Sequence, residues 1–395
     1  MITNFLFTLV GYDLKAKTSD RFRDDQMSIH QLKYGFFGEV GGLLAAVKKA
    51  HRDSFPKKEK ELAMEELGDA LWYLTALIRR SSYTVNEIGI ATLQYLQQEL
   101  SNSEHIKPDE DVTFNEIDGL LAFLNKQLPE SKDTLLYKLA YNTSLLFFES
   151  DSAANECARG NELYSKLLSL LAMVAAKFGL KLLDIAIANN IKTESRWAPP
   201  NSKYLDLFDE NLLPYEQLPR QFDIKFLERN IHGKKIVVQQ LNGVNIGDPL
   251  TDNRQDGDGY RFHDVFHLAY IAHLGWSPVI RALLKVKRKS KPQVDENQDG
   301  ARAIFIEEGI ATWVFNHARD LDFFEGVEQG KLEYGLLKQI QNMVSGYEVE
   351  KCPLWQWEIA ILEGFKVFRS LLATGSGIVS VNMEQHCISF KPLES

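Results

Sequence analysis

FGEVGGLLAAVKKAHRD (residues 37–53) and EELGDALWYL (residues 65–74) are the two stretches that decide the fold of the N-terminal half. Around the first stretch, apolar residues recur at the spacing of an amphipathic helix, which we expect over residues 28–49 with Ser28 as its N-cap. Around the second, the same spacing predicts a helix from about Lys58 to Arg80. The sequence therefore predicts two successive amphipathic helices.

Further helices are expected to follow as far as about residue 193, so this half of the chain is all-helical. Capping-box patterns at residues 84–87 and 113–116 each begin a helix, and the first of these ends near residue 100. Between them, SNSEHIKPDEDV (101–112) is polar and acidic and contains a proline, which indicates a linker. The segment 197–200, with its tryptophan and two prolines, ends the helical region.

An internal similarity suggests that the helical region is duplicated. ELGDALWYLTALIRR, which starts at Glu66, aligns with ELYSKLLSLLAMVAA, which starts at Glu162. With one residue inserted, NEIGIA (86–91) likewise aligns with LDIAIA (183–188). We expect two related units that bury their apolar faces against each other, as an intrachain version of a two-fold dimer. Chance similarity between amphipathic helices is the alternative.

After residue 200 the pattern changes to that of an α+β domain. FDIKFLE (222–228) and KIVVQQL (235–241), followed by Asn242-Gly243, predict short strands with a turn. IVSVNM (378–383) and HCISF (386–390) predict a terminal hairpin. Helices are expected between them at residues 262–284, 301–318, 332–345 and 355–372.

The expected fold class is therefore mainly α, with tandem all-α helical units followed by an α+β C-terminal domain that contains a small antiparallel sheet. The expected limits are residues 1–105 and 113–197 for the helical units and residues 201–395 for the C-terminal domain.

Composition indicates an ordinary globular protein. The chain has 395 residues, of which 45% are hydrophobic and 25% charged. Its formal net charge of -9 argues against a general nucleic-acid-binding protein, because such proteins usually carry a basic excess. Three widely spaced cysteines favour neither a disulfide framework nor a thiolate zinc site. The apolar start lacks a cationic lead and is short, so we expect neither a signal peptide nor a membrane partner, and a cytoplasmic location.

Acidic side chains fall on the apolar faces of the two N-terminal helices. Glu66 and Asp69 are three residues apart, so a helix places both on one face, and Glu39 lies at the edge of the apolar stripe of the preceding helix. Ionised carboxylates are rarely buried unless they are paired or bind a metal, and an all-oxygen set suits Mg²⁺. The alternative is that a lysine or arginine from another helix neutralises them. Basic residues expected to hold a polyphosphate follow within about three turns: Lys48, Lys49 and Arg52.

The two stretches resemble the MazG family of nucleoside triphosphate pyrophosphohydrolases, whose members carry ExxE on one helix and ExxD on the next. The resemblance covers about residues 28–100, and FGLKLLDIAIANNIKTESRW (178–197) resembles the end of such domains. Glu39 matches the first glutamate of ExxE, whereas Gly42 stands where the second belongs. Glu66 and Asp69 match ExxD.

This resemblance implies hydrolysis of a nucleoside triphosphate to monophosphate and pyrophosphate, with Mg²⁺ as cofactor and Mn²⁺ as the alternative, in nucleotide-pool control or in phage defence. Glu39, Glu66 and Asp69 would be both the metal ligands and the catalytic residues. The second unit has Glu162 and Ser165 at the ExxD positions and so resembles a degenerate scaffold copy. Residues of its last helix are expected to touch the nucleotide: Asn189, Asn190, Lys192 and Arg196.

The missing ligand at Gly42 leaves other functions open. One alternative is a binding module whose weakened site senses nucleotides and regulates the C-terminal domain, and another is a helical scaffold without chemistry. We expect a nucleoside triphosphate as the partner, and either a monomer with an internal pseudo-dimer or a homodimer.

In the C-terminal half, residues 258–290 and 299–315 resemble the separate C-terminal domain that is attached to some MazG-like proteins. His263 and His267 are four residues apart, so they share one helical face. Glu308 falls on the apolar stripe of a later helix, with Glu307 at its edge. These four residues form a candidate second site for zinc, iron or manganese. The alternative is a polar core in which the histidines and glutamates are hydrogen-bonded to one another.

A basic run follows the histidines in the sequence. We expect it to be a solvated helix end whose charge suits the helix dipole, and binding of phosphates or RNA is the alternative. The run holds five cations: Lys285, Lys287, Arg288, Lys289 and Lys291.

Overall fold

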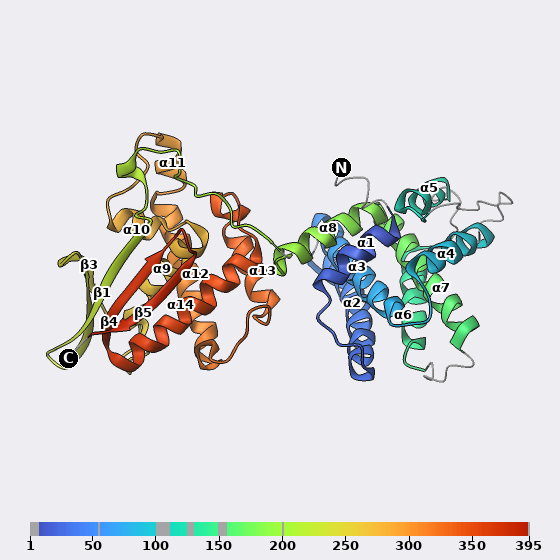
Figure 1. Ribbon diagram of the computed structural model, residues 1–395. Helices are drawn as coiled ribbons and strands as arrows, with labels where there is room; N and C mark the ends of the chain where they lie inside the picture. The colour runs from blue at the N-terminus through green and yellow to red at the C-terminus, as the bar shows by residue number, and fades with distance from the viewer. Residues whose placement is uncertain are drawn as a thin grey trace. The chain divides into compact units, whose positions relative to one another are not determined.

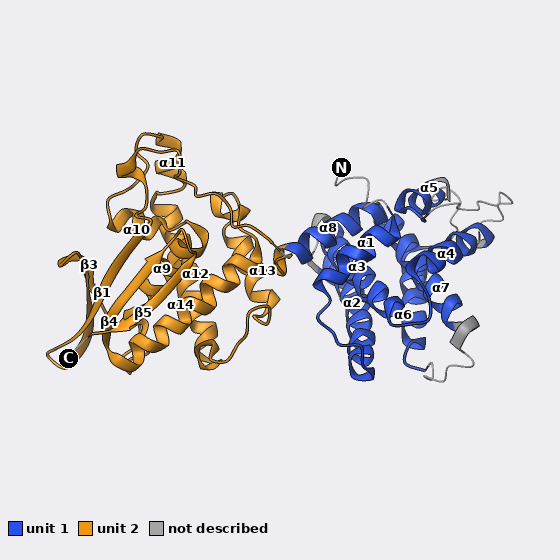
Figure 2. Ribbon diagram, viewed as in Figure 1, with its two compact units in different colours: residues 1–194 blue, residues 195–395 orange. Residues whose placement is uncertain are grey.

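The chain forms two compact units, residues 1–194 (unit 1) and 195–395 (unit 2), which Figure 2 distinguishes by colour. The computed structural model describes residues 8–53, 56–99, 111–124, 130–148, 156–199 and 201–393. The end of the helix expected near residue 100 and most of the expected linker therefore lie outside the described residues.

Unit 1 is built from helices around one apolar core, as Figure 1 shows in blue to green. Both capping-box predictions are confirmed, because the Thr84 and Thr113 backbone N–H groups donate to Glu87 (2.7 Å) and Glu116 (2.6 Å). The prediction that Ser28 is an N-cap was wrong. The helix begins at Gln26, and the carboxylate of Asp25 accepts from the Ser28 N–H at 2.7 Å. The helices are α1 (Leu9–Ser19), α2 (Gln26–Asp53), α3 (Pro56–Arg79), α4 (Val85–Glu99), α5 (Phe114–Leu124), α6 (Lys132–Leu145), α7 (Glu156–Lys177) and α8 (Leu182–Arg196).

Equivalent contacts recur in the two halves of unit 1. Helix α1 packs on α3 as α5 packs on α7, and Thr8 and Thr113, which precede α1 and α5, pair with each other in an isolated antiparallel bridge. The aligned positions of α4 and α8 also make matching contacts across the halves. Thr92 donates to the Ser165 carbonyl at 3.3 Å, and Asn189 donates to Asp69 at 2.9 Å. These paired contacts support our interpretation of a duplication with internal two-fold pseudo-symmetry.

Unit 2 contains a five-stranded antiparallel sheet in the order β3-β2-β1-β4-β5. The two predicted hairpins are present, but β3 was missed because VNIGDPL contains glycine and proline and is mostly exposed. Asn242-Gly243 is therefore the turn into β3, while His232-Gly233 joins β1 to β2, and all four residues have positive φ. The strands are β1 (Gln221–Ile231), β2 (Lys234–Leu241), β3 (Val244–Leu250), β4 (Ser376–Asn382) and β5 (Cys387–Pro392).

The helices of unit 2 enclose a second apolar core, and α9 and α14 pack on each other and on β4 and β5. The prediction of a single helix over residues 262–284 was wrong, because two helices occupy this range. Gly275 ends α9 with φ 65°, and the Ser277 hydroxyl caps α10 by accepting from the Ile280 N–H. The helices are α9 (Asp264–Leu274), α10 (Pro278–Leu283), α11 (Pro292–Asn297), α12 (Ala301–Arg319), α13 (Tyr334–Met343) and α14 (Leu354–Thr374).

The prediction of a solvated helix end for the basic run fails at Arg288, whose side chain is only 1% exposed. Its guanidinium donates to the buried carboxylate of Asp299 at 2.6 Å and to Glu348 at 2.6 Å. The run follows α10 as a turn rather than continuing a helix. Arg288 thus connects this turn to Asp299, which lies just before α12.

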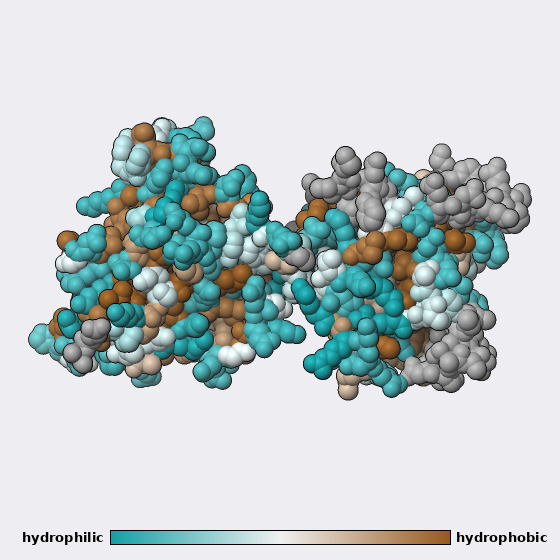
Figure 3. Space-filling model, in the orientation of Figure 1, coloured by the Kyte–Doolittle hydropathy of each residue, from teal (hydrophilic) through white to brown (hydrophobic). Residues whose placement is uncertain are grey.

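The fold class is confirmed as mainly α with a small antiparallel sheet. The face of the molecule seen in Figure 3 is largely hydrophilic, with apolar residues scattered among charged ones. Among the described helices, none combines the length and apolarity needed to span a bilayer.

Candidate functional site

Two glycines of α2 allow α3 to lie close against it. A Cβ atom at Gly35 would lie 2.3 Å from the Tyr73 ring, and one at Gly42 would lie 2.2 Å from Oε2 of Glu66. The partner of the later glycine comes earlier in α3, so the two helices run antiparallel. The same register places Glu39 level with Asp69. Absence of a side chain at Gly42 therefore creates the space that the Glu66 carboxylate occupies.

Glu39 and Glu66 are joined by a side-chain hydrogen bond, and both are half-buried. Burial, the charge of Asp69 and the hydrogen bond to Glu66 together raise the pKa of Glu39 to about 8. Burial also raises the pKa of Glu66, although the hydrogen bond from Glu39 opposes this rise. Burial of the pair therefore favours one shared proton over two negative charges.

Helix α8, from the second half of unit 1, supplies polar partners to Asp69. The Asn189 amide donates to Oδ1 of Asp69 at 2.9 Å, and the Tyr12 hydroxyl donates to the Asn189 amide oxygen at 2.9 Å. The Lys192 ammonium forms ion pairs with the other oxygen of Asp69 and, at 3.2 Å, with Glu65. A lysine from another helix thus neutralises Asp69, which is the predicted alternative to metal binding.

The basic residues expected to hold phosphates lie toward the end of α2. Lys48, Lys49 and Arg52 are exposed there, within three turns of Gly42. Asn190 is 2% exposed, and neither polar atom of its amide has a hydrogen-bond partner among the described residues.

Arg196, which the resemblance led us to expect at the nucleotide, forms a buried ion pair. It lies in unit 2, is 3% exposed, and donates to Glu358 at 2.7 Å and to the Leu332 carbonyl at 2.6 Å. The basic character of the α8 sequence did not reveal this buried ion pair, because both partners come from distant parts of the chain.

Sequence reasoning also missed the part played by Tyr12 of α1. Its ring is fully buried and its hydroxyl fixes the amide of Asn189, one step from Asp69. A tyrosine at a helical core position gives no separate signal for such a role, so only the tertiary contact identifies it.

The equivalent positions in the second half do not form a carboxylate pair. Glu162, the counterpart of Glu66, is exposed. The Ser165 hydroxyl, at the counterpart of Asp69, donates to the Asn161 carbonyl of its own helix at 2.7 Å. Only the first half thus brings acidic side chains together at this register.

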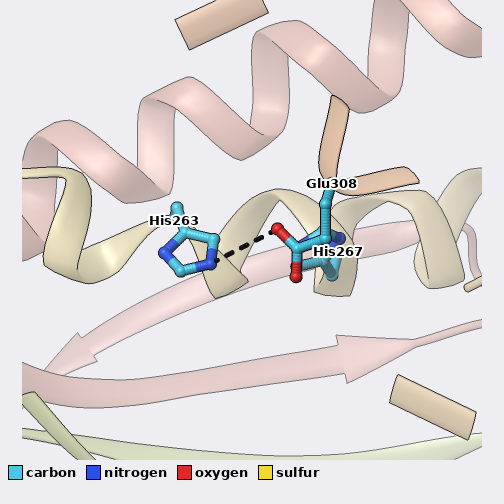
Figure 4. A group of neighbouring side chains, drawn as sticks. All are labelled: His263, His267 and Glu308. Atoms are coloured by element: carbon cyan, nitrogen blue, oxygen red, sulfur yellow. Dashed lines mark ion pairs between the residues drawn. The ribbon is translucent and has the colours of Figure 1, made fainter. Parts of the chain in front are cut away.

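The histidines and glutamates singled out in the C-terminal half form a cluster in unit 2. His263 immediately precedes α9, His267 lies one turn further along the chain in α9, and Glu308 reaches them from α12, as Figure 4 shows. Their ligand atoms all lie within 4.8 Å of one another, and among the described residues this is the one group of three or more potential ligands so close together. The three carboxylates of unit 1 are therefore more widely spaced.

The burial of Glu307 and Glu308 is the reverse of what we expected. Glu307 is fully buried, whereas the side chain of Glu308 is 38% exposed. The buried face of α12 is centred on Ala303, Ile310 and Val314, and Glu307 lies within this face because it is four and three residues from the first two. Glu308 points instead toward the rim of the histidine cluster.

The C-terminal part of the chain matches a known family model. Residues 203–394, which make up nearly all of unit 2, match the family model described as the MazG C-terminal domain. The chain is thereby consistent with a MazG-like protein that carries this C-terminal domain. Searches of curated proteins and of solved structures gave no match.

Proposed function

We propose that unit 1 is a magnesium-dependent nucleoside triphosphate pyrophosphohydrolase, which converts a (d)NTP into a (d)NMP and pyrophosphate. The observation that carries the proposal is the hydrogen-bonded, half-buried pair of Glu39 and Glu66, with Glu66 opposite Gly42 and the charge of Asp69 raising the pKa of Glu39. Acidic groups in a partly dry site ionise together only beside a positive partner. An all-oxygen ligand set fits Mg²⁺, with Mn²⁺ as the alternative. The MazG C-terminal domain in unit 2 adds support for a nucleotide-related role.

In this proposal Glu39, Glu66 and Asp69 hold the cation. Bound Mg²⁺ supplies neutralisation of the phosphate charge and activation of water. Asn189 and Lys192 orient the Asp69 carboxylate through the contacts described above. The oxygen of the attacking water would form a bond to the α-phosphorus as the bond from that phosphorus to the α,β-bridging oxygen breaks. Pyrophosphate would leave with the bridging oxygen, and the proton of the water would pass to bulk solvent.

Positioning of the triphosphate falls to the basic residues, because phosphoryl transfer depends mainly on alignment and charge stabilisation. The exposed Lys48 and Lys49 lie on the same helix as Glu39 and offer ammonium groups to phosphate oxygens. The buried Asn190 amide, unpartnered within the described residues, is a further group suited to a nucleotide.

The direct test incubates the full-length chain with each common NTP and dNTP, with and without Mg²⁺. We expect pyrophosphate and monophosphate in equal amounts, and only when Mg²⁺ is present. Quantification of both products by ion-exchange chromatography checks this. Release of inorganic phosphate and a nucleoside diphosphate instead would show that a different bond is cleaved and would reject the proposal.

A nucleotide sensor is the second candidate, and the ion pair between Lys192 and Asp69 favours it. Gly42 stands where the resemblance implies a fourth carboxylate, so the site has fewer acidic groups to hold a metal. Asp69 already has in Lys192 a positive partner that is not a metal. Such a site would bind nucleotide, without turnover, and regulate unit 2. Saturable binding by calorimetry in the absence of any product would support sensing over catalysis. Absence of both binding and turnover would leave the scaffold interpretation.

Replacing Gly42 with glutamate is expected to strengthen the site, because it restores the ExxE pattern with Glu39. The added side chain must displace the Glu66 carboxylate, which is the mobile end of a flexible side chain. One more carboxylate ligand should lower the Mg²⁺ concentration for half-maximal turnover about tenfold, which corresponds to about 1.4 kcal/mol. The measurement is a magnesium titration of pyrophosphate release.

Gly41→Glu is the matched control for this prediction. Gly41 is exposed on the same helix, and nothing lies within 4 Å of a Cβ placed there. The control adds the same charge and the same gain in helix propensity outside the site. Equal magnesium titrations for the two variants would show that position 42 contributes no ligand.

A further inference from the structure

We propose that the histidine cluster of unit 2 is a binding site for a divalent transition metal such as Zn²⁺ or Fe²⁺. The ligands are Nε2 of His263, Nε2 of His267 and one carboxylate oxygen of Glu308, which come from the start of α9 and from α12. Two imidazoles and one carboxylate form a ligand set that suits these ions better than Mg²⁺. The inference is independent of the hydrolytic reaction proposed for unit 1.

The Nδ1 atoms of both histidines are engaged outside the cluster, so Nε2 is the nitrogen that each ring turns toward the cluster. Nδ1 of His263 lies 2.9 Å from the Tyr260 carbonyl, which only accepts, so this nitrogen carries the hydrogen. Nδ1 of His267 lies 2.8 Å from Oε1 of Glu307. A metal-bound histidine commonly donates its other N–H to a carbonyl or a carboxylate in this way. Both Nε2 atoms therefore face carboxylates of the cluster, Glu308 for both rings and Asp264 for His263 as well.

Glu307 holds His267 in place without being a ligand itself. It is fully buried, and its second oxygen accepts from the Val279 N–H at the start of α10, at 2.8 Å. The Glu307 carboxylate therefore has fixed partners on both oxygens. This arrangement fixes the ring of His267 with Nε2 facing the cluster, which is the positioning role of an outer-sphere carboxylate.

The distances from Glu308 to the two histidines fit a shared ion better than direct hydrogen bonds. Oε2 of Glu308 lies 3.7 Å from Nε2 of His263 and 3.6 Å from Nε2 of His267, beyond ordinary hydrogen-bond length. Two ligands of a tetrahedral zinc ion, each about 2.1 Å from it, lie about 3.4 Å apart. Nε2 of His267 is also fully buried without a hydrogen-bond partner in the described structure. A metal ion supplies the partner that this atom needs.

A further carboxylate and the solvent-facing side of Glu308 border the three ligands. Oδ1 of Asp264 lies 3.0 Å from Nε2 of His263, while Oδ2 accepts from Gln239, so a second carboxylate stands beside the ligands. Glu308 forms the exposed side of the cluster, where water or a small anionic ligand can reach the ion. Two histidines and a carboxylate with open positions are typical of reactive rather than purely structural metal sites.

The test uses the full-length chain, stripped with a chelator and titrated with Co²⁺ in millimolar Mg²⁺, which keeps the carboxylates of unit 1 occupied by the harder ion. We expect one Co²⁺ per chain with visible absorption bands of an imidazole-ligated ion, displaced by Zn²⁺. Glu308→Gln and His263→Gln should each weaken Co²⁺ binding at least about tenfold. Glu308 is partly exposed, so its replacement leaves the fold intact, which far-ultraviolet circular dichroism checks.

His317→Gln and Glu325→Gln are the matched controls, because both residues are in unit 2 and lie outside the cluster. They should bind Co²⁺ as the unaltered chain does. If the unaltered chain gains no imidazole-type absorption, or if the Glu308 and His263 variants bind as tightly as the controls, the cluster is a network of buried charges without metal and the proposal is overturned.

Discussion

Replacing Glu66 with glutamine is expected to lower magnesium-dependent pyrophosphate release by about 100-fold or more, because metal stabilisation of transition-state charge contributes several kcal/mol. The amide keeps the size of the carboxylate beside Gly42 but removes the charge that the proposed cation needs. The loss should be in kcat as well as in the response to Mg²⁺, since the reaction and the cation share this site. Initial rates over a magnesium titration measure both effects.

Glu162→Gln is the control, since Glu162 occupies the aligned position in the second half of unit 1. Its side chain is exposed and has no carboxylate counterpart at Ser165, so the same substitution should leave turnover unchanged. Helical circular dichroism should be the same for both variants. Equal turnover in the Glu66 variant and the unaltered chain would remove the proposed reaction centre.

Replacing Asp299 with alanine is expected to destabilise unit 2 by about 3–5 kcal/mol, the usual cost of leaving one partner of a buried ion pair alone. Asp299 is fully buried, and it accepts from the Arg288 guanidinium at 2.6 Å and from the Arg288 backbone N–H at 2.8 Å. Glu348 remains as a second partner of Arg288, which places the effect toward the lower end of that range. Denaturant unfolding followed by tryptophan fluorescence measures the change, since Trp276 and Trp357 are buried in unit 2.

Glu296→Ala provides the comparison for this prediction. Glu296 is exposed on α11, three residues before Asp299, so its loss should change the free energy of unfolding by less than about 0.5 kcal/mol. A double variant that also replaces Arg288 with methionine should recover part of the loss, because it removes a buried charge that only Glu348 would still pair. A change below about 1 kcal/mol for Asp299→Ala would mean that this ion pair does not hold the turn after α10.

The apolar periodicity of the chain was enough to predict the helical region of unit 1 from α2 onward and the two hairpins of unit 2, whereas α1 was not predicted. It also indicated that Glu66 and Asp69 share one face of a helix, because i and i+3 positions coincide on any α-helix. Strong local signals, such as the capping boxes at Thr84 and Thr113, are satisfied within a few residues and so can be read without knowledge of the fold.

Other features depended on partners distant in the chain. The break at Gly275 and the weak edge strand β3 were missed, because their local signals are shorter than the helical and strand patterns beside them. Two ion pairs join residues more than 30 positions apart in the chain: Asp69 with Lys192, and Arg196 with Glu358. The burial of Glu307 rather than Glu308 depends on which face of the helix is packed against the rest of the domain.

The sequence by itself determined which residue types stand at helical spacing: the carboxylates of α2 and α3, the histidines of α9 and the glycine at position 42. Only the tertiary structure decided which of these charges meet and which cation or carbonyl neutralises them. The physical reason is that backbone periodicity is a local property, whereas the cost of burying a charge is set by whatever the rest of the fold packs around it.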